Sequence, residues 1–212
     1  MNKLFETGGR RAVRILCSTI LATTMLAGFF SADRAEAHPH VFVDCSLTFE
    51  FDDQGLKGIR QKWWFDEMFA TMILGDFDTN HDNKLSADEE KAIENGAFVN
   101  LRNFSYFTRI FVDGEDYLPV EATEFKPLIE DSTLVYSFFV PLRITPDKRP
   151  HIVKAAVFDE TFYTSIQMDP KNYIKGITEQ MNGAVALEPV PEMAYFQGQI
   201  IPDAAVLTLS PR

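Results

Sequence analysis

Cysteine is scarce in this sequence of 212 residues, which contains only Cys17 and Cys45. Two cysteines exclude a small scaffold held by many disulfide bonds. Basic residues are also in deficit, because 20 Lys and Arg stand against 31 Asp and Glu and leave a formal net charge of −11. That charge repels phosphate groups, so the composition argues against nucleic acid and anionic membrane surfaces as main partners.

Internal repeats and low-complexity linkers are absent as well, which favours one globular domain over a repeat array. Hydrophobic residues make up 46% of the chain, enough for a packed core. The length also suits a single domain. The heavy aromatic content, with 19 Phe, 6 Tyr and 2 Trp, favours β-strands.

The first 37 residues have the features of a secretory signal peptide. The apolar stretch at residues 15–30 is shorter than the roughly 20 residues that a membrane-spanning helix needs. Basic residues precede it, and a small-x-small cleavage site follows at residues 35–37. We predict cleavage after Ala37 and release of residues 38–212 into the periplasm, with no membrane insertion afterwards. An uncleaved anchor helix is the alternative.

A β-hairpin is predicted directly after the cleavage site. Apolar and polar residues alternate over residues 41–51, as in a half-buried strand. The apolar face includes Cys45, which we expect to be a small buried hydrophobe. Residues 52–55 form a predicted turn, and residues 56–64 form the return strand.

The spacing of apolar residues changes after this hairpin. Phe65, Met68, Phe69, Met72 and Ile73 recur every three or four residues, which predicts a helix. Helical spacing returns over residues 86–104, and short strand-like runs follow up to residue 168. Prolines interrupt the segment beyond residue 182, for which we expect edge strands and loops. The predicted fold is α+β: a single antiparallel, β-rich, sandwich-like domain with an EF-hand-like helix–loop–helix inserted at about residues 65–104.

The segment between the two predicted helices matches the EF-hand pattern for calcium binding. Over the twelve residues 78–89, the positions that supply ligands in that pattern hold Asp78, Asn80, Asp82, Lys84, Ser86 and Glu89. Lys84 needs to offer only its backbone carbonyl, and Glu89 provides the final bidentate carboxylate. Because Ca²⁺ prefers six to eight oxygen ligands, these residues predict one Ca²⁺ site.

One position departs from the EF-hand pattern. Asn83 stands where the loop usually has Gly in a left-handed turn, and Asn is the best non-Gly residue there. We therefore expect weak binding, with a Kd of about 10⁻⁴–10⁻³ M. A single hand favours a structural role over calcium sensing. The alternative is an acidic, solvated loop that holds no ion.

Cleavage after Ala37 would leave His38 at the new N-terminus. Its amine and imidazole can chelate one metal ion together. His40 and Asp44 share one face of the following strand. Such nitrogen-rich ligands suit Ni²⁺, Co²⁺, Zn²⁺ or Cu²⁺ better than Ca²⁺. The distant His151 or His81 could complete the site, whereas the alternative is that both terminal histidines are only solvated.

The mature sequence resembles a bacterial exported family known as domain of unknown function 1007. The resemblance rests on five motifs: His38-Pro39-His40-Val41-Phe42-Val43-Asp44, the segment 63–69 (Trp-Trp-Phe-Asp-Glu-Met-Phe), the acidic loop 76–89, Asp113-Gly114, and the segment 157–163 (Val-Phe-Asp-Glu-Thr-Phe-Tyr). Members of this family are often described as periplasmic components of an ABC-type transport system. The resemblance therefore implies a link with nickel, cobalt or other metal transporters, and it carries no catalytic residues.

These features support a first hypothesis, an exported periplasmic accessory protein that binds metal ions for a membrane transporter and has one structural Ca²⁺ site. The alternative hypothesis is a Ca²⁺-stabilised, non-enzymatic interaction module with no transition-metal role. We predict no enzyme activity, because no nucleophile elbow, zinc-protease helix or Gly-rich phosphate loop is present. The two hypotheses differ in whether His38 and His40 are needed.

Overall fold

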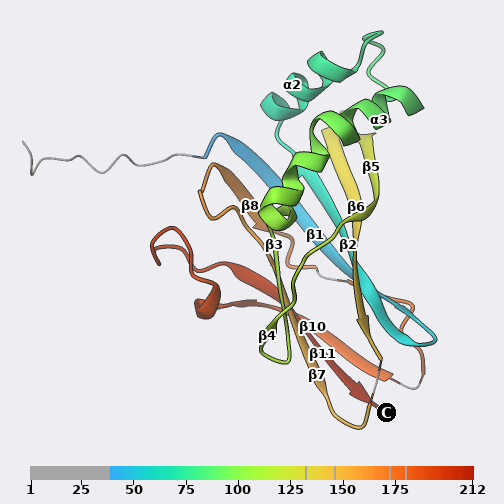
Figure 1. Cartoon of the computed structure of the whole chain (residues 1–212), viewed down its shortest axis with the longest axis vertical. Helices are drawn as coiled ribbons and strands as arrows, with labels where there is room; N and C mark the ends of the chain where they lie inside the picture. The colour runs from blue at the N-terminus through green and yellow to red at the C-terminus, as the bar shows by residue number, and fades with distance from the viewer. Residues whose placement is uncertain (1–38, 132, 146, 172, 180) are drawn as a thin grey trace, which may run out of the picture. The chain divides into compact units, whose positions relative to one another are not determined.

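The strands of this protein lie in two sheets (Figure 1). The computed structural model describes residues 39–131, 133–145, 147–171, 173–179 and 181–212. The predicted signal peptide and His38 lie outside these residues. Sheet A has the order β5-β6-β2-β1-β8, with β9 also paired to β1, and sheet B has the order β10-β11-β7-β3-β4.

The elements of sheet A are β1 (Val41–Asp52), β2 (Gly55–Phe65), β5 (Thr123–Glu130), β6 (Thr133–Ile144), β8 (Thr164–Met168) and β9 (Tyr173–Lys175). Those of sheet B are β3 (Thr108–Val112), β4 (Glu115–Asp116), β7 (His151–Val157), β10 (Met181–Pro189) and β11 (Asp203–Pro211). The helices are α2 (Glu67–Phe77), α3 (Ala87–Gly96) and the 3₁₀ segments η1 (Phe98–Phe107) and η2 (Pro191–Met193). The chain is thus α+β and rich in strands, as predicted.

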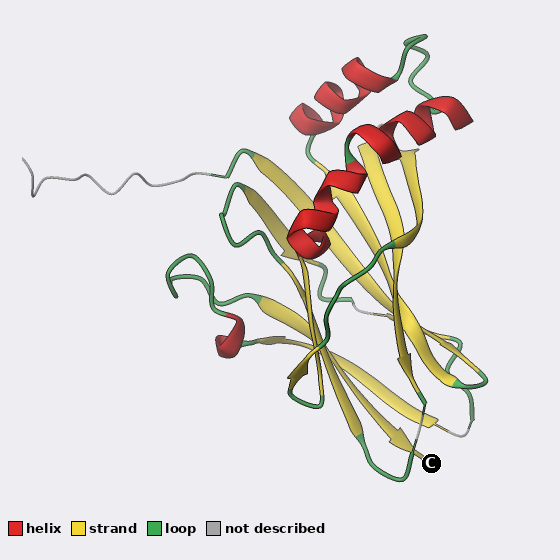
Figure 2. Cartoon of the chain, in the orientation of Figure 1, coloured by secondary structure: helices red, strands yellow, loops and turns green. Residues whose placement is uncertain are grey.

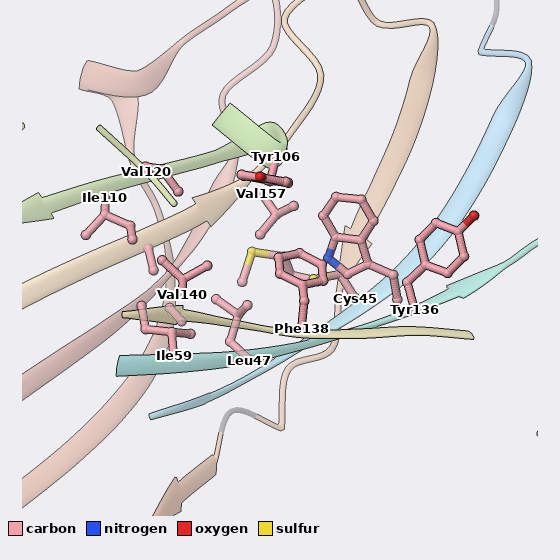
Figure 3. Close-up of a cluster of buried hydrophobic side chains, with 14 of the residues drawn as sticks. Cys45, Leu47, Ile59, Tyr106, Ile110, Val120, Tyr136, Phe138, Val140 and Val157 are labelled. Atoms are coloured by element: carbon pink, nitrogen blue, oxygen red, sulfur yellow. The ribbon is translucent and has the colours of Figure 1, made fainter. Parts of the chain in front are cut away.

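The predicted hairpin is present as β1 and β2. The alternation along β1 turns Val43, Cys45, Leu47 and Phe49 toward the interior, where each is at most 2% exposed. They belong to one core cluster with residues of sheet B such as Ile110, so the two sheets share a core (Figure 3). The expectation for Cys45 is confirmed, and burial raises the pKa of its thiol.

A short chain of buried polar groups also connects the two sheets. The Trp63 indole Nε1 donates to Gln61 Oε1 at 3.0 Å, and Gln61 Nε2 donates to Thr108 Oγ1 at 2.8 Å. Gln61 is fully buried, so these bonds satisfy an amide that would otherwise be costly to bury. The bonds fix β2 of sheet A against β3 of sheet B.

The helical insertion lies between β2 and β3 (Figure 2). Helix α2 begins after Asp66, whose carboxylate accepts the Phe69 N–H at 2.9 Å. It buries Ala70 and Ile73, while Met68 and Met72 are 67% and 53% exposed. The spacing correctly predicted a helix, but Met68 and Met72 do not share the buried side of it with Ile73, because the helix turns them away from the core.

The second helix is shorter than predicted. Helix α3 ends at Gly96, and the chain continues as η1. At the end of η1, Ser105, Tyr106 and Phe107 have φ angles of 51°, 53° and 52°. Three successive left-handed residues cannot continue a right-handed helix, so the chain turns there into β3.

Two strand assignments also differ from the sequence-based expectation. Strands β8 and β9 pair with β1 in parallel, so sheet A is mixed where only antiparallel pairing was expected. Strand β11 lies in the interior of sheet B, between β10 and β7, although this segment was expected to form edge strands and loops. The prolines that suggested an edge fall almost entirely in the connection between β10 and β11. No helix among the described residues has the length and apolarity that crossing a membrane requires.

Candidate functional site

The predicted calcium loop joins α2 to α3. Asp78 follows the last turn of α2, and Ser86 caps the first turn of α3. The two ends of the loop are buried, with Asp78 3% and Glu89 5% exposed, whereas residues 79–84 are exposed. The loop is therefore anchored at its first and last acidic positions.

The first half of the loop is organised around the Asp78 carboxylate. Its two oxygens accept the backbone N–H of Asp82 at 3.3 Å and of Asn83 at 2.9 Å. Asn80 Oδ1 accepts the Asp82 N–H at 3.0 Å, and Asp82 Oδ1 accepts the Lys84 N–H at 2.9 Å. Asn83 has a φ of 58°, the left-handed conformation that the sixth position of an EF-hand loop requires.

The second half of the loop is closed by Glu89. Its Oε1 accepts the backbone N–H and the hydroxyl of Thr79 at 2.8 and 2.9 Å, while its Oε2 accepts the same two groups of Ser86 at 2.9 and 2.8 Å. These hydrogen bonds lower the pKa of Glu89 to about 2, and those from Ser86 contribute most. Glu89 thus links the start of the loop to the start of α3.

The oxygen donors of the loop are of the kind that Ca²⁺ prefers, but the carboxylates among them do not converge on one point. The described residues contain no group of three His, Cys, Asp or Glu side chains placed to hold one metal ion. Glu89 would have to exchange some of its four hydrogen bonds for metal coordination. Asp78, Asn80, Asp82, the Lys84 carbonyl and Ser86 would supply the other oxygens, and a bound ion would hold the loop in one conformation.

The predicted transition-metal residues are not brought together. His40 is exposed, and its ring centroid lies 5.1 Å from that of Tyr163. Asp44 is exposed on the same side of β1, but a strand rises about 3.3 Å per residue, so the two Cα atoms are roughly 13 Å apart. Side chains of a strand stand roughly perpendicular to it, so an imidazole and a carboxylate separated by this rise do not converge on one ion with metal–ligand bonds of about 2 Å. His38 lies outside the described residues.

His151 has a different environment from the one considered for it. It is 8% exposed and lies between two carboxylates, with Nδ1 2.8 Å from Asp113 Oδ2 and Nε2 3.3 Å from Asp147 Oδ1. The Ile152 N–H and then His151 lower the pKa of Asp113. This cluster joins the β3–β4 turn to the start of β7 and includes no residue of the calcium loop.

Sequence reasoning missed a groove on the outer face of sheet A, which we call the Trp64 groove. It has a volume of about 440 Å³. Its aromatic and acidic lining residues are Phe42, Asp44, Trp64, Asp66, Glu130 and Asp131. The alternation of β2 places Trp63 in the core and Trp64 on this outer face. Asp66 caps α2, and its Oδ2 accepts the Phe42 N–H at 2.7 Å.

Comparison with known proteins places these features in a family. A sequence profile described as "Protein of unknown function (DUF1007)" matches residues 22–199. The chain belongs to this family. The DUF1007 match includes both the loop at residues 78–89 and every residue named above for the Trp64 groove, and it confirms the resemblance drawn from the sequence motifs.

A curated relative adds a second similarity. An uncharacterised 15.5 kDa protein encoded in the trpE 3′ region of Spirochaeta aurantia is 30% identical over 140 residues. That alignment covers 66% of this chain and 99% of the relative. A shorter protein therefore resembles about two thirds of the DUF1007 chain described here.

Proposed function

We propose that this protein is an exported, periplasmic, non-enzymatic interaction module. Its helix–loop–helix contains an EF-hand-type loop that one Ca²⁺ ion stabilises. The observation that carries the proposal is the anchoring of Asp78 and Glu89, the first and last oxygen positions of the loop. Both are nearly buried, and they flank a loop whose sixth residue, Asn83, is left-handed.

Calcium would act on a loop that already has a closed conformation. Glu89 closes it by accepting hydrogen bonds from Thr79 and Ser86. Binding must displace part of this hydrogen bonding, which supports the weak affinity expected from the sequence. A weak site of this kind suits a structural role, in which Ca²⁺ shifts the helix pair toward one conformation.

The proposed partner is the one that the family resemblance implies, a component of a metal or ABC-type transporter in the membrane. Exposed aromatic residues at the start of β1 and just before β8 support an interaction role. Phe42 is 54% exposed and Tyr163 57% exposed. The export that such a role needs stays a prediction from residues 1–37.

A transition-metal role stays the second hypothesis, and it depends on His38. His40 and Asp44 cannot both bind the ion that His38 would hold, so the chelate would consist of the N-terminal amine with His38 or His40. Thermal unfolding with Ni²⁺, Co²⁺, Cu²⁺ or Zn²⁺ tests this hypothesis. Stabilisation that is lost in the double variant His38→Ala/His40→Ala supports it, and no stabilisation contradicts it.

The calcium proposal is tested by thermal unfolding of the purified protein in EDTA, in 10 mM Mg²⁺ and in 10 mM Ca²⁺. At a Kd of about 10⁻⁴–10⁻³ M, 10 mM Ca²⁺ should stabilise the native state by about 1.4–2.7 kcal/mol. Mg²⁺ should stabilise it less, because Mg²⁺ demands a smaller, octahedral site and gives up its water reluctantly.

Two variants of neighbouring acidic residues make the test specific. Asp82→Asn removes a charged ligand from an exposed loop position and should abolish most of the Ca²⁺ effect. Asp88→Asn removes an exposed carboxylate at the eleventh position, which is not a ligand in the EF-hand pattern, and should preserve the effect. Equal stabilisation by Mg²⁺ and Ca²⁺, or an unchanged Ca²⁺ effect in Asp82→Asn, would contradict the proposal.

A further inference from the structure

Residues of β1, β2 and β8 line the centre and one end of the Trp64 groove, and Glu130 of β5 and Thr133 of β6 line the other end. Asp44 of β1 is paired with Trp64 of β2 on one side and with Gln167 of β8 on the other. Paired residues of adjacent strands point to the same face, so these three side chains form one row across the sheet. The backbone pairing of the three strands holds this row together on the outer face of sheet A.

The groove continues along β1 and β8 into a second hollow. This hollow has a volume of about 370 Å³, shares Asp44, Trp64 and Gln167 with the groove, and extends to Asp169 and Pro170. Together the two hollows form one extended surface, which crosses sheet A from Glu130 to Gln167 and then continues along β1 and β8 to Asp169. An elongated groove with an aromatic residue at its centre fits an extended chain better than a compact small molecule.

The charge of this surface has one sign. Its lining contains five carboxylates and no Lys, Arg or His: Asp44, Asp66, Glu130, Asp131 and Asp169. Lys62, which lies outside the lining, pairs with Glu130 at 2.6 Å. Among the described residues, Asp44 and Asp131 form no ion pair within 4.0 Å, so the groove keeps a negative potential that attracts cations.

Trp64 already interacts with a cation of the protein itself. The Lys62 Nζ lies 5.1 Å from the centroid of the indole ring, and the indole Nε1 donates to Glu130 Oε2 at 3.3 Å. A cation within about 6 Å of an indole face is attracted by the ring's quadrupole. The groove therefore combines an indole suited to cations with two carboxylates, Asp44 and Asp131, that have no cationic partner.

We propose that the Trp64 groove binds an extended, Lys- or Arg-bearing segment of a partner protein, with a cationic side chain between Trp64 and the Asp44 carboxylate. The inference rests on the proposed interaction role and names its surface and the chemistry of its partner. The arrangement does not suit a bare metal ion, since the described residues contain no group of three side chains placed to hold one. Nucleic acid is repelled by the same carboxylates.

The two adjacent tryptophans provide a test with an internal control. Protein purified from cells that express the full chain is labelled with ¹⁵N-tryptophan, and the two indole N–H signals are followed by NMR. The probe is the peptide acetyl-Gly-Arg-Gly-Lys-Gly-amide, with an otherwise identical peptide containing Gln in place of Arg and Lys as the neutral control. We expect the cationic peptide to shift the Trp64 signal saturably and to leave the signal of buried Trp63 in place.

Charge-matched variants separate the groove from the overall charge. Asp44→Asn/Asp131→Asn should weaken peptide binding about tenfold, because it removes two carboxylates that face the bound cation. Asp53→Asn/Asp203→Asn removes the same charge from exposed residues outside the groove and should change the Kd less than twofold. Each variant should also keep its thermal midpoint within a few degrees of the parent protein, which shows that it is folded.

Several results would overturn the inference. These are a Trp64 signal that does not move, equal binding of the neutral peptide, and equal weakening in the two double variants. A shift of Trp64 by maltotetraose without any shift by the cationic peptide would assign the groove to carbohydrate instead. Each titration is run in Ca²⁺ and in EDTA. A missing Ca²⁺ effect on stability contradicts only the calcium proposal, whereas missing peptide binding contradicts only the groove proposal.

Discussion

The loop at residues 78–89 and the Trp64 groove are both rich in carboxylates, but they use them in opposite ways. In the loop, Asp78 and Glu89 are nearly buried and accept hydrogen bonds from nearby backbone and hydroxyl groups. In the groove, Asp44 and Asp131 are exposed and form no ion pair with the described residues. A carboxylate that binds its own backbone stabilises local structure, whereas an unpaired carboxylate on a rigid sheet is available to a partner.

The largest expected effect on stability is the difference between substitutions on the two faces of β2, the strand that carries both tryptophans. Trp63→Ala should lower the free energy of unfolding by about 3–5 kcal/mol, because Trp63 is 1% exposed and fills the core. Trp64→Ala should cost only about 1 kcal/mol, because it removes outer-face contacts alone. Urea unfolding of both variants measures the difference. An equal loss in the two would show that Trp64 supports the fold and would weaken the argument that it is there to bind.

A second prediction concerns the pH dependence of the loop. The pKa of Glu89 is about 2 in the folded protein, below the ordinary value of 4.5. Glu89 therefore contributes stability that is fully present above about pH 4.5 and is lost as the pH falls toward 2, where the unfolded chain is protonated first. Between about pH 2 and pH 4.5, unfolding of the parent protein should therefore take up about one proton at Glu89. The Glu89→Gln variant should lack that proton uptake.

Asp52 provides the matched control for the Glu89 prediction. Its pKa is also lowered to about 2, mainly by the Arg143 guanidinium, which bonds both carboxylate oxygens at 2.7 and 2.8 Å. Asp52→Asn should likewise lower the proton uptake on unfolding by about one, and the double variant should lower it by about two. Unfolding midpoints measured between pH 2 and 6 give these numbers. An unchanged pH profile in Glu89→Gln would mean that the hydrogen bonds of its carboxylate do not persist in solution.

The loop could be predicted from the sequence because its residues are local. Asp78 and Glu89 are eleven positions apart, and the ligand spacing is visible without a fold. The alternation of β1 was equally local, and it correctly placed Cys45 in the core. What the spacing could not show is that Glu89 bonds to Thr79 and Ser86, because a ligand pattern does not specify which backbone and hydroxyl groups a carboxylate contacts.

The groove could not be predicted because its residues are far apart in the chain. Asp44, Trp64 and Gln167 meet only through the pairing of β1 with β2 and of β1 with β8. The second pairing is parallel and returns the chain from sheet B to sheet A, which no local periodicity reveals. The same limit applies to His40 and Asp44: strand parity correctly gave them one face, but the rise along the strand separates them.

A smaller effect is expected from the sixth position of the loop. Asn83 has a φ of 58°, so Asn83→Ala should cost about 1 kcal/mol of stability, since Ala pays the steric penalty of the left-handed conformation. Asn83→Gly should leave stability nearly unchanged and tighten Ca²⁺ binding several-fold, because Gly is the residue that this EF-hand position prefers. Calorimetric titration with Ca²⁺ checks the second expectation. Weaker binding in the Gly variant would argue against an EF-hand conformation in the bound loop.

The smallest effect on stability is expected in the groove. Asp44→Asn should change the free energy of unfolding by less than about 0.5 kcal/mol, because Asp44 is exposed and makes no ion pair with the described residues. Asp44→Asn should raise the free energy of unfolding slightly, because it relieves repulsion from Asp66 and Asp131. This gain in stability should shrink at high salt. Urea unfolding at low and high ionic strength, with Asp53→Asn as the control, measures it. A clear loss of stability in Asp44→Asn would mean that this carboxylate is used internally, as those of the loop are, and the contrast between the two acidic regions would fail.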